Sequence, residues 1–184
     1  MSVFLFWTLF IFHAFFNGYI SAIKELKMEI ESITVCPGND KMRYPIRDLS
    51  FNRMNETHSV LSFKVDYLDD IGENIWTQIE LERWANGGWV SVPFITQKNP
   101  CKMGLNYFPE IWVTFLKAMK VEEPDKCPIP KGSYSLQNFL IPIQTVKIPL
   151  WTGRFRLKNI WTGSKKSKDY YYCLEVGLTC EEKL

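Results

Sequence analysis

"CPIPKGSYSLQNF", residues 127–139, places a cysteine and two prolines directly before a segment that alternates like a β-strand. Side chains of a strand point alternately to opposite faces, so Tyr134 and Leu136 would share one face of this segment. A disulfide at Cys127 would tie the start of the strand to another part of the chain. The stretch therefore predicts a strand that is anchored covalently at one end.

The first 22 residues, MSVFLFWTLFIFHAFFNGYISA, contain no Lys, Arg, Asp or Glu. Their apolar core is followed by small and polar residues, as in a secretory signal peptide. A transmembrane anchor is the alternative, but Asn17 and Gly18 interrupt the run before the roughly 20 apolar residues that a span needs. We therefore expect residues 1–22 to be a signal peptide, cleaved between Gly18 and Ala22, and residues 23–184 to form a single secreted domain.

The expected mature chain is nearly neutral. All 22 basic and all 20 acidic residues follow the signal, which gives a net charge of +2. Nucleic-acid binding usually needs a clustered basic surface, and the short patch of Lys165, Lys166 and Lys168 is more typical of a solvated loop. We therefore expect no nucleic-acid partner.

All five cysteines lie in the mature part of the chain. In an oxidising compartment the simplest arrangement is two disulfides and a remaining cysteine, and spacing alone leaves the pairing open. No two of them form a CxxC motif, which argues against a zinc site. Asn55 begins the sequon Asn-Glu-Thr, which predicts an N-linked glycan on a surface loop. The cysteines are Cys36, Cys101, Cys127, Cys173 and Cys180.

Most of the mature chain has the period of β-strands, with apolar residues on one face. In the clearest run, residues 61–67, Leu, Phe, Val and Tyr alternate with Ser, Lys and Asp. Asn-Gly-Gly at residues 86–88 predicts a hairpin turn, because Asn and Gly accept the positive φ that it needs. Further strands are expected at 28–35, 75–82, 90–92, 134–140, 146–148, 154–160 and 170–179.

Residues 105–119 instead have helical spacing, and Cys101 precedes them while Cys127 follows. Pro109 is expected in the first turn, where its missing N–H costs little. The chain therefore reads as an all-β domain with one helix. The apolar face of that helix would consist of Leu105, Phe108, Ile111, Trp112, Phe115, Leu116 and Met119.

Candidate catalytic groups are few. After loss of His13 with the signal, His58 is the remaining histidine, and a catalytic triad would need it to be buried beside a nucleophile. No GxSxG or phosphate-binding glycine loop occurs. Glu80 and Glu82 share a strand face, but their neighbours point to the core, so a solvated face is the simpler interpretation than a glycosidase pair. We expect no catalytic site, metal or cofactor.

Four tryptophans lie at expected strand ends. Trp84 and Trp89 flank the turn at 86–88, and Trp151 and Trp161 each stand directly before Thr-Gly. Aromatic residues at such positions are candidates for contact with a membrane surface. Alternatively, they cap the end of the core. We take Trp84, Trp89 and Trp151 as the membrane-contact candidates.

The segment CPIPKGSYSL resembles the Cys-Pro-x-x-x-Gly-x-Tyr-x-Leu signature of the ganglioside GM2 activator family of lipid-recognition domains. The order that follows, with Pro142, Ile148-Pro149, Thr152-Gly153 and RFRLKNI, is also similar to that family. Upstream, IELERWANGGWVSVPF, NPCKMGLNYFPEIW and RDLSF resemble its earlier strands and its helix-bearing loop. The chain looks more like the arthropod branch of secreted members than like the mammalian activator, and several members of that branch are linked to chemosensation.

The resemblance implies an antiparallel β-cup or open β-sandwich with an apolar lumen, in a protein that is secreted or lysosomal. It also implies the disulfides Cys36–Cys173 and Cys101–Cys127, which leave Cys180 unpaired or linked to another chain. Phe94 stands where the mammalian activator has a cysteine, and the extra cysteines of its long loop are missing. The resemblance therefore does not extend to ganglioside specificity.

The leading hypothesis is a secreted, non-enzymatic carrier that holds the hydrocarbon part of a lipid, or another hydrophobic small molecule, with transient membrane contact. The alternative is a secreted interaction module, or an accessory subunit for a receptor or an enzyme, with the same fold and a packed core. The same inward residues would serve either, since sequence does not distinguish a filled interior from a hollow one. The lumen candidates are Leu61, Phe63, Val65, Ile79, Leu81, Phe108, Trp112, Phe115, Leu136, Phe155, Leu157, Leu174 and Val176.

Overall fold

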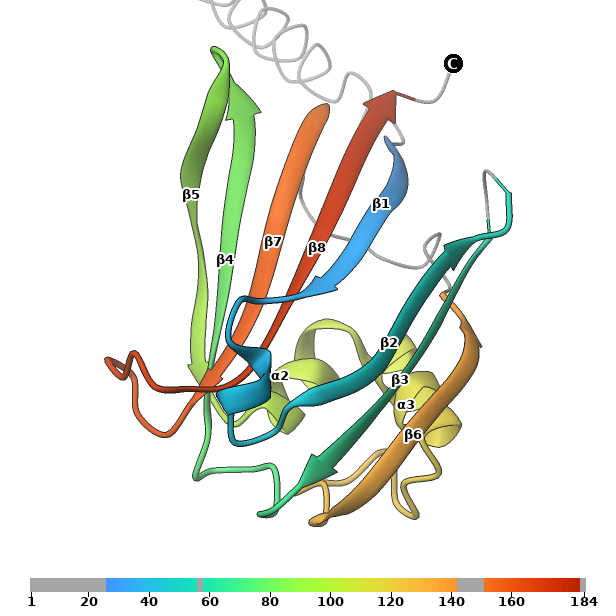
Figure 1. Ribbon diagram of the computed structural model, residues 1–184, viewed down its shortest axis with the longest axis vertical. Coiled ribbons are helices and arrows are strands. Elements are labelled where there is room, and N and C mark those ends of the chain that lie inside the picture. The colour runs from blue at the N-terminus through green and yellow to red at the C-terminus, as the bar shows by residue number, and fades with distance from the viewer. Residues whose placement is uncertain (1–25, 56–57, 142–150, 183–184) are drawn as a thin grey trace, which may run out of the picture.

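The computed structural model of the chain describes residues 26–55, 58–141 and 151–182 (Figure 1). The expected signal peptide at 1–22 lies outside these residues. So do Thr57 of the glycosylation sequon, Pro142 and the expected strand at 146–148.

Two antiparallel sheets make up most of the described chain, which confirms the all-β, open antiparallel fold expected from the sequence. The five-stranded sheet has the order β1-β8-β7-β4-β5, and the three-stranded sheet has the order β2-β3-β6. The larger sheet consists of β1 (Leu26–Val35), β8 (Tyr170–Glu182), β7 (Gly153–Thr162), β4 (Trp76–Ala85) and β5 (Gly88–Lys98). The smaller sheet consists of β2 (Ile46–Arg53), β3 (Ser59–Tyr67) and β6 (Gly132–Leu140).

The prediction of one helix over residues 105–119 is wrong, because the segment forms two helices, α2 (Pro100–Tyr107) and α3 (Pro109–Ala118). Phe108 separates them with φ −140° and ψ 47°, outside the helical region. The ring of a proline disfavours the helical conformation in the residue before it, so Pro109 ends one helix and occupies the first turn of the next. A short 3-10 helix, η1 (Asn39–Lys41), precedes β2.

Trp112 of α3 packs directly on α2. A Cβ atom added to Gly104 would lie 2.3 Å from the indole ring of Trp112, so this close approach requires glycine. The two helices are thereby held against each other as one unit.

The hairpin predicted at residues 86–88 is present between β4 and β5. Asn86 and Gly87 have positive φ angles of 52° and 80°, and Trp84 pairs with Trp89 across the two strands. The conformation is the one that Asn and Gly adopt at low cost, which confirms the sequence prediction.

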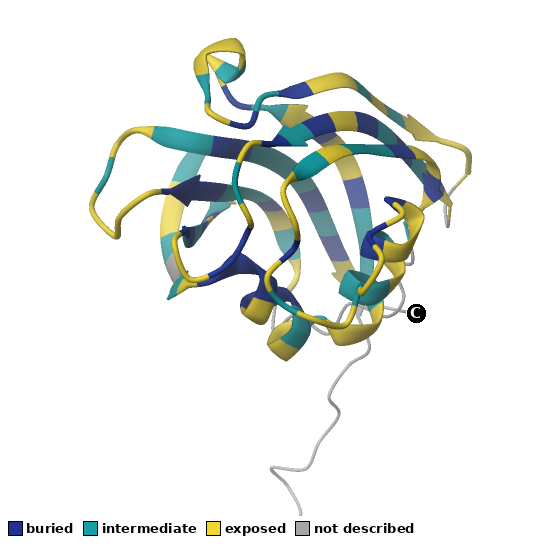
Figure 2. Cartoon of the chain, turned by 90° about the horizontal axis from the view of Figure 1, so that it is seen from below, coloured by how far each residue is buried: buried dark blue, intermediate teal, exposed yellow. Residues whose placement is uncertain are grey.

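The sheets and helices are arranged as a ring around the interior (Figure 2). On one side β1 neighbours β2, and an ion pair between Arg53 and Glu29 joins these two edge strands. On the other side α2 neighbours β5 and α3 neighbours β6, so the helices complete the wall between the remaining sheet edges. The result is a cup with two β walls and one helical wall.

The lower end of the cup, as drawn in Figure 1, is filled by aromatic side chains. Trp161 stacks on Tyr172 with ring centroids 4.5 Å apart, and Tyr67 lies 5.9 Å from Trp161. Tyr44 meets Tyr67 edge to face at 5.7 Å and is fully buried. Such contacts add to the burial of apolar area. These four residues form the floor of the cup.

Tyr44 is fixed in the floor by polar contacts at its tip. Its hydroxyl donates to Asp69 Oδ2 at 2.8 Å, and Arg43 Nε donates to the same oxygen at 2.7 Å. The hydrogen bond from Arg43 lowers the pKa of Asp69, and burial raises the pKa of Tyr44. The carboxylate thus orients the tyrosine while the ring closes the floor.

The structure bonds the cysteines in the pairs that the family resemblance implies. Cys36–Cys173 joins the end of β1 to β8 across 137 residues of sequence, and Cys101–Cys127 joins α2 to the segment before β6 across 26 residues. The second bond anchors the strand that begins at Gly132, as the opening stretch predicts.

We expect the double variant Cys101→Ser/Cys127→Ser to lose about 3.5 kcal/mol of unfolding free energy, because the unfolded chain is no longer restricted by that loop. Urea unfolding followed by circular dichroism measures the loss. Cys180→Ala is the control, since it removes a sulfur atom but no cross-link. An unfolding free energy unchanged from the wild type would contradict the structural role given to this bond.

Candidate functional site

The inward face of the five-stranded sheet is organised in rows across the strands. One row consists of Leu81, Leu157, Val176 and Ile33, which pair in register from β4 through β7 and β8 to β1. The rows on either side are Arg83, Phe155, Leu178 and Ile30 above, and Ile79, Asn159, Leu174 and Val35 below.

The middle of this face is incompletely covered. Leu157, Leu174 and Val176 keep solvent-accessible surface although they lie on central strands and point into the ring. Phe155, one inward position above Leu157, is 1% exposed, and Trp161, at the floor, is 3% exposed. A solid core would bury Leu157, Leu174 and Val176 as well, because protein interiors are close-packed. The interior is therefore packed at the floor and more open at mid-height.

The opposite wall presents apolar and aromatic side chains. Phe63 of β3 is 4% exposed and lies 6.0 Å, centroid to centroid, from Phe115 of α3. Phe115 also meets Phe139 of β6 at 5.8 Å and stacks on Trp112 at 6.0 Å. Phe115 and Trp112 are half-buried, so the helical wall also borders accessible interior.

The expected lumen residues fall into three groups. Phe108 is half-exposed at the junction of the helices and does not pack against the main core, so the structure does not bring it together with the others. Half-buried positions are Trp112, Phe115, Leu157, Leu174 and Val176. Buried positions are Leu61, Phe63, Val65, Ile79, Leu81, Leu136 and Phe155.

Two polar residues of the inward face, Arg83 and Asn159, were not among the lumen residues expected from sequence. Alternation along β4 and β7 places them there, in the series that contains Leu81 and Phe155. Arg83 forms no ion pair with any described residue; its guanidinium lies 5.5 Å from the centre of the Trp151 ring and 3.4 Å from the carbonyl of Thr152. Continuing the inward alternation by two residues, from Leu81 in β4 and from Leu157 in β7, would have identified both.

The expected membrane-contact tryptophans occupy one end of the larger sheet but different faces. Trp84 and Trp89 lie edge to face at 5.3 Å, and Trp89 is covered by Arg156, which belongs to the outward face of β7. Trp151 lies instead against Phe155, at the inward side. Trp84 and Trp151 are each 42% exposed.

Further exposed apolar residues lie at the same end of the cup. Val90 is 51% exposed in the β4–β5 hairpin, and Leu140 is 51% exposed at the end of β6. Met54, directly after β2, is 69% exposed. Both sheets therefore contribute apolar side chains to this rim, which is the upper end in Figure 1.

The remaining candidates from sequence lie outside the cup. Asn55 and His58 are exposed beyond β2, with Asn55 Oδ1 3.1 Å from His58 Nδ1. Glu82, on the outward face of β4, pairs with Arg156 at 2.6 Å, while Glu80 is exposed.

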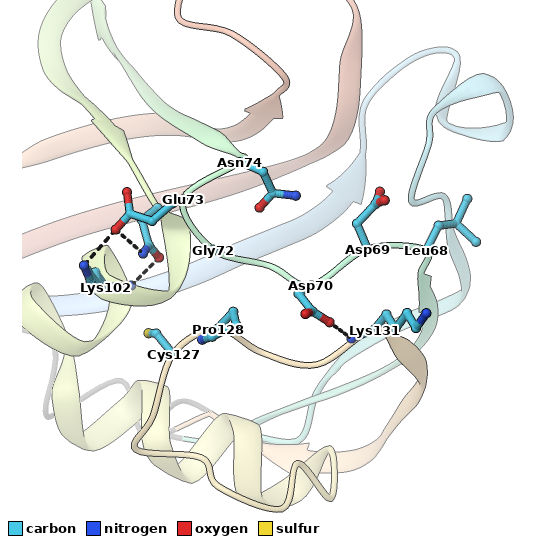
Figure 3. A pocket seen from close by; sticks show the side chains of 11 residues that line it. Leu68, Asp69, Asp70, Gly72, Glu73, Asn74, Lys102, Cys127, Pro128 and Lys131 are labelled. Atoms are coloured by element: carbon cyan, nitrogen blue, oxygen red, sulfur yellow. Dashed lines mark hydrogen bonds and ion pairs between the residues drawn. The ribbon is translucent and has the colours of Figure 1, made fainter.

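A groove of about 650 Å³ lies between the β3–β4 loop and the segment around Cys127 (Figure 3). Its carboxylates, those of Asp69, Asp70 and Glu73, all accept hydrogen bonds from within the chain. Lys102 Nζ lies 2.7 Å from Glu73 Oε1, and this hydrogen bond lowers the pKa of Glu73. Asp70 accepts a hydrogen bond of 2.8 Å from the backbone N–H of Lys131. The arrangement stabilises the loops at the floor.

No protein-family model matches the chain, and no curated protein matches it significantly. Within the described residues, no helix is long and apolar enough to cross a membrane.

Cys180 is 2% exposed and points inward near the end of β8. Burial raises the pKa of its thiol, which lowers the fraction of reactive thiolate. We expect the folded protein to migrate as a monomer on a non-reducing gel and its thiol to react with a maleimide far more slowly than after unfolding. A covalent dimer that disappears with reductant would contradict this burial and favour a linked partner.

Proposed function

We propose that the protein is a secreted, non-enzymatic lipid carrier that holds the hydrocarbon part of a lipid inside the cup. The observation that carries the proposal is the half-buried set of Leu157, Leu174 and Val176 on central strands. Apolar side chains in the middle of an enclosing wall retain accessible surface, and an acyl chain would cover them.

The energetics favour such an occupant. Burial of a methylene group contributes about 0.8 kcal/mol, so ten methylenes would contribute about 8 kcal/mol before the costs of association are subtracted. Trp112 and Phe115 on the helical wall offer aromatic surface to the same chain. Shielding a lipid that is nearly insoluble in water would let the protein extract it, transport it or present it, including in chemosensation.

Three features support secretion. The two disulfides are typical of proteins that fold in an oxidising compartment. The apolar, uncharged first 22 residues have the pattern of a signal peptide. Asn55 is exposed, as a glycan acceptor must be.

The exposed apolar rim would make transient contact with a membrane surface during loading or release. Trp84 lies near the end of β4 and Trp151 directly before the adjacent strand β7, whereas Leu140 comes from the smaller sheet. Tryptophan favours the interface between lipid and water, because its ring is apolar and its N–H is polar.

An interaction module with a packed core is the second candidate, and the floor of the cup favours it. Tyr44, Tyr67 and Trp161 fill that end as tightly as in an ordinary core. The two candidates differ in what the middle of the cup contains, so a variant that fills the middle distinguishes them.

We expect Leu157→Trp to reduce uptake of a fluorescent fatty acid at least about tenfold while changing the unfolding free energy by less than about 1 kcal/mol. In a solid core the larger ring would instead cost about 1–3 kcal/mol. Lys158→Trp is the matched control, because it adds the same ring to the next residue on the opposite face. A large loss of stability in Leu157→Trp, together with no fatty-acid uptake by the wild type, would establish the packed interaction module instead.

We expect Trp151→Ser to weaken binding to phospholipid vesicles in a flotation assay, since an exposed aromatic anchor is lost. Tyr107→Ser removes an aromatic residue that is 51% exposed at the end of α2, away from the rim, and should leave vesicle binding unchanged. Equal effects of the two substitutions would argue against a membrane-directed rim.

A further inference from the structure

The inward face of the larger sheet contains an amide whose hydrogen bonding is incomplete. Asn159 lies on β7 between Ile79 of β4 and Leu174 of β8, which are both apolar. Thr77 Oγ1 donates to Asn159 Oδ1 at 3.2 Å. No described residue accepts a hydrogen bond from Asn159 Nδ2, and the side chain is half-buried, so this donor remains accessible from the interior.

Thr77 contacts the carbonyl end of this amide. Thr77 is fully buried, and its hydroxyl has Asn159 Oδ1 as its partner. Since that contact occupies the carbonyl end of the amide, the NH₂ end is the one that is left over. A second donor on the same face, Trp161 Nε1, also has no partner among the described residues, but it is fully buried and therefore out of reach of a ligand.

The surroundings make an unpaired donor costly once the cup is filled. A plain hydrocarbon over Leu157 and Leu174 would exclude water and leave the amide without an acceptor. Leaving a buried donor unsatisfied costs about 1–3 kcal/mol, so the wall discriminates against such an occupant. A binding site that presents a hydrogen-bonding group rejects an analogue that lacks the matching group.

We propose that the ligand of the cup is an oxygenated long-chain molecule, whose carbonyl or other acceptor oxygen binds the Asn159 amide while its hydrocarbon part covers the neighbouring leucines and Val176. The inference rests on the proposed carrier function and adds the class of ligand to it. Asn159 is a specificity residue in this account, and Thr77 positions it.

The test is a competition measured in one tube. The wild type is incubated with an equimolar mixture of heptadecane, dioctyl ketone and methyl pentadecyl ketone, repurified and extracted, and the bound compounds are quantified by gas chromatography with mass spectrometry. The ketones have the chain length of the alkane and can only accept a hydrogen bond. The two carbonyl positions report where along the chain the amide binds.

The variant for comparison is Thr77→Val/Asn159→Leu. Replacing both partners leaves no buried hydroxyl without its acceptor, which the single Asn159→Leu change would do. Comparing the ketone-to-alkane ratio between the two proteins cancels the different water solubilities of the compounds. Glu80→Gln is the control, since Glu80 is exposed outside the cup and the change leaves the inward wall and its amide intact.

We expect the ratio of at least one ketone to heptadecane to fall about tenfold in the double variant, with total uptake retained and the ratio of Glu80→Gln unchanged. Equal ratios in the wild type and the double variant, with both loaded, would overturn the inference but leave the carrier function intact. If the wild type takes up none of the three compounds and no fluorescent fatty acid, the carrier function itself fails, and the inference fails with it.

Discussion

The Cys101–Cys127 bond is the constraint on which the cup depends. The edges of the two sheets meet directly at β1 and β2, but at β5 and β6 the helices complete the wall. The bond joins the first turn of α2 to the segment that leads into β6, so it holds the helical wall against the start of that strand. The proline-rich stretch from Cys127 to Gly132 therefore serves to close a ring, and the strand after it becomes part of the wall.

An interior that is packed at the floor and open at mid-height has an energetic cost. Unfilled apolar space forgoes the dispersion contacts that a close-packed core would make. The two disulfides offset part of this cost, because they restrict the unfolded chain and so raise the free energy of unfolding. The aromatic floor adds tight packing at one end of the cup. A ligand that binds the folded chain alone would stabilise it further, so stability and loading are thermodynamically linked in this fold.

Much of the fold follows from sequence patterns. Alternation predicted the buried face of β3. Asn86-Gly87 predicted the hairpin between β4 and β5, because few other residues adopt the positive φ angles that this turn needs. The split of the helical segment at Phe108 was missed. The helical spacing of apolar residues continues through Pro109, whereas the helical backbone conformation is interrupted at Phe108. The inward positions of Arg83 and Asn159 were missed for another reason: polar residues were assumed to face solvent. The partial burial of Leu157 depends on the distance between its sheet and the opposite wall of the cup. No local sequence pattern predicts that distance.

The central claim is that the middle of the cup holds a lipid, and native mass spectrometry of the purified protein tests it most directly. The protein would be purified without detergent, its mass compared before and after organic extraction, and the extract analysed for lipids. We expect an added mass near one long-chain molecule per chain, which extraction removes and lipid analysis identifies. A mass equal to that of the chain without a bound molecule, together with no uptake of added fatty acid or sphingolipid, would contradict it.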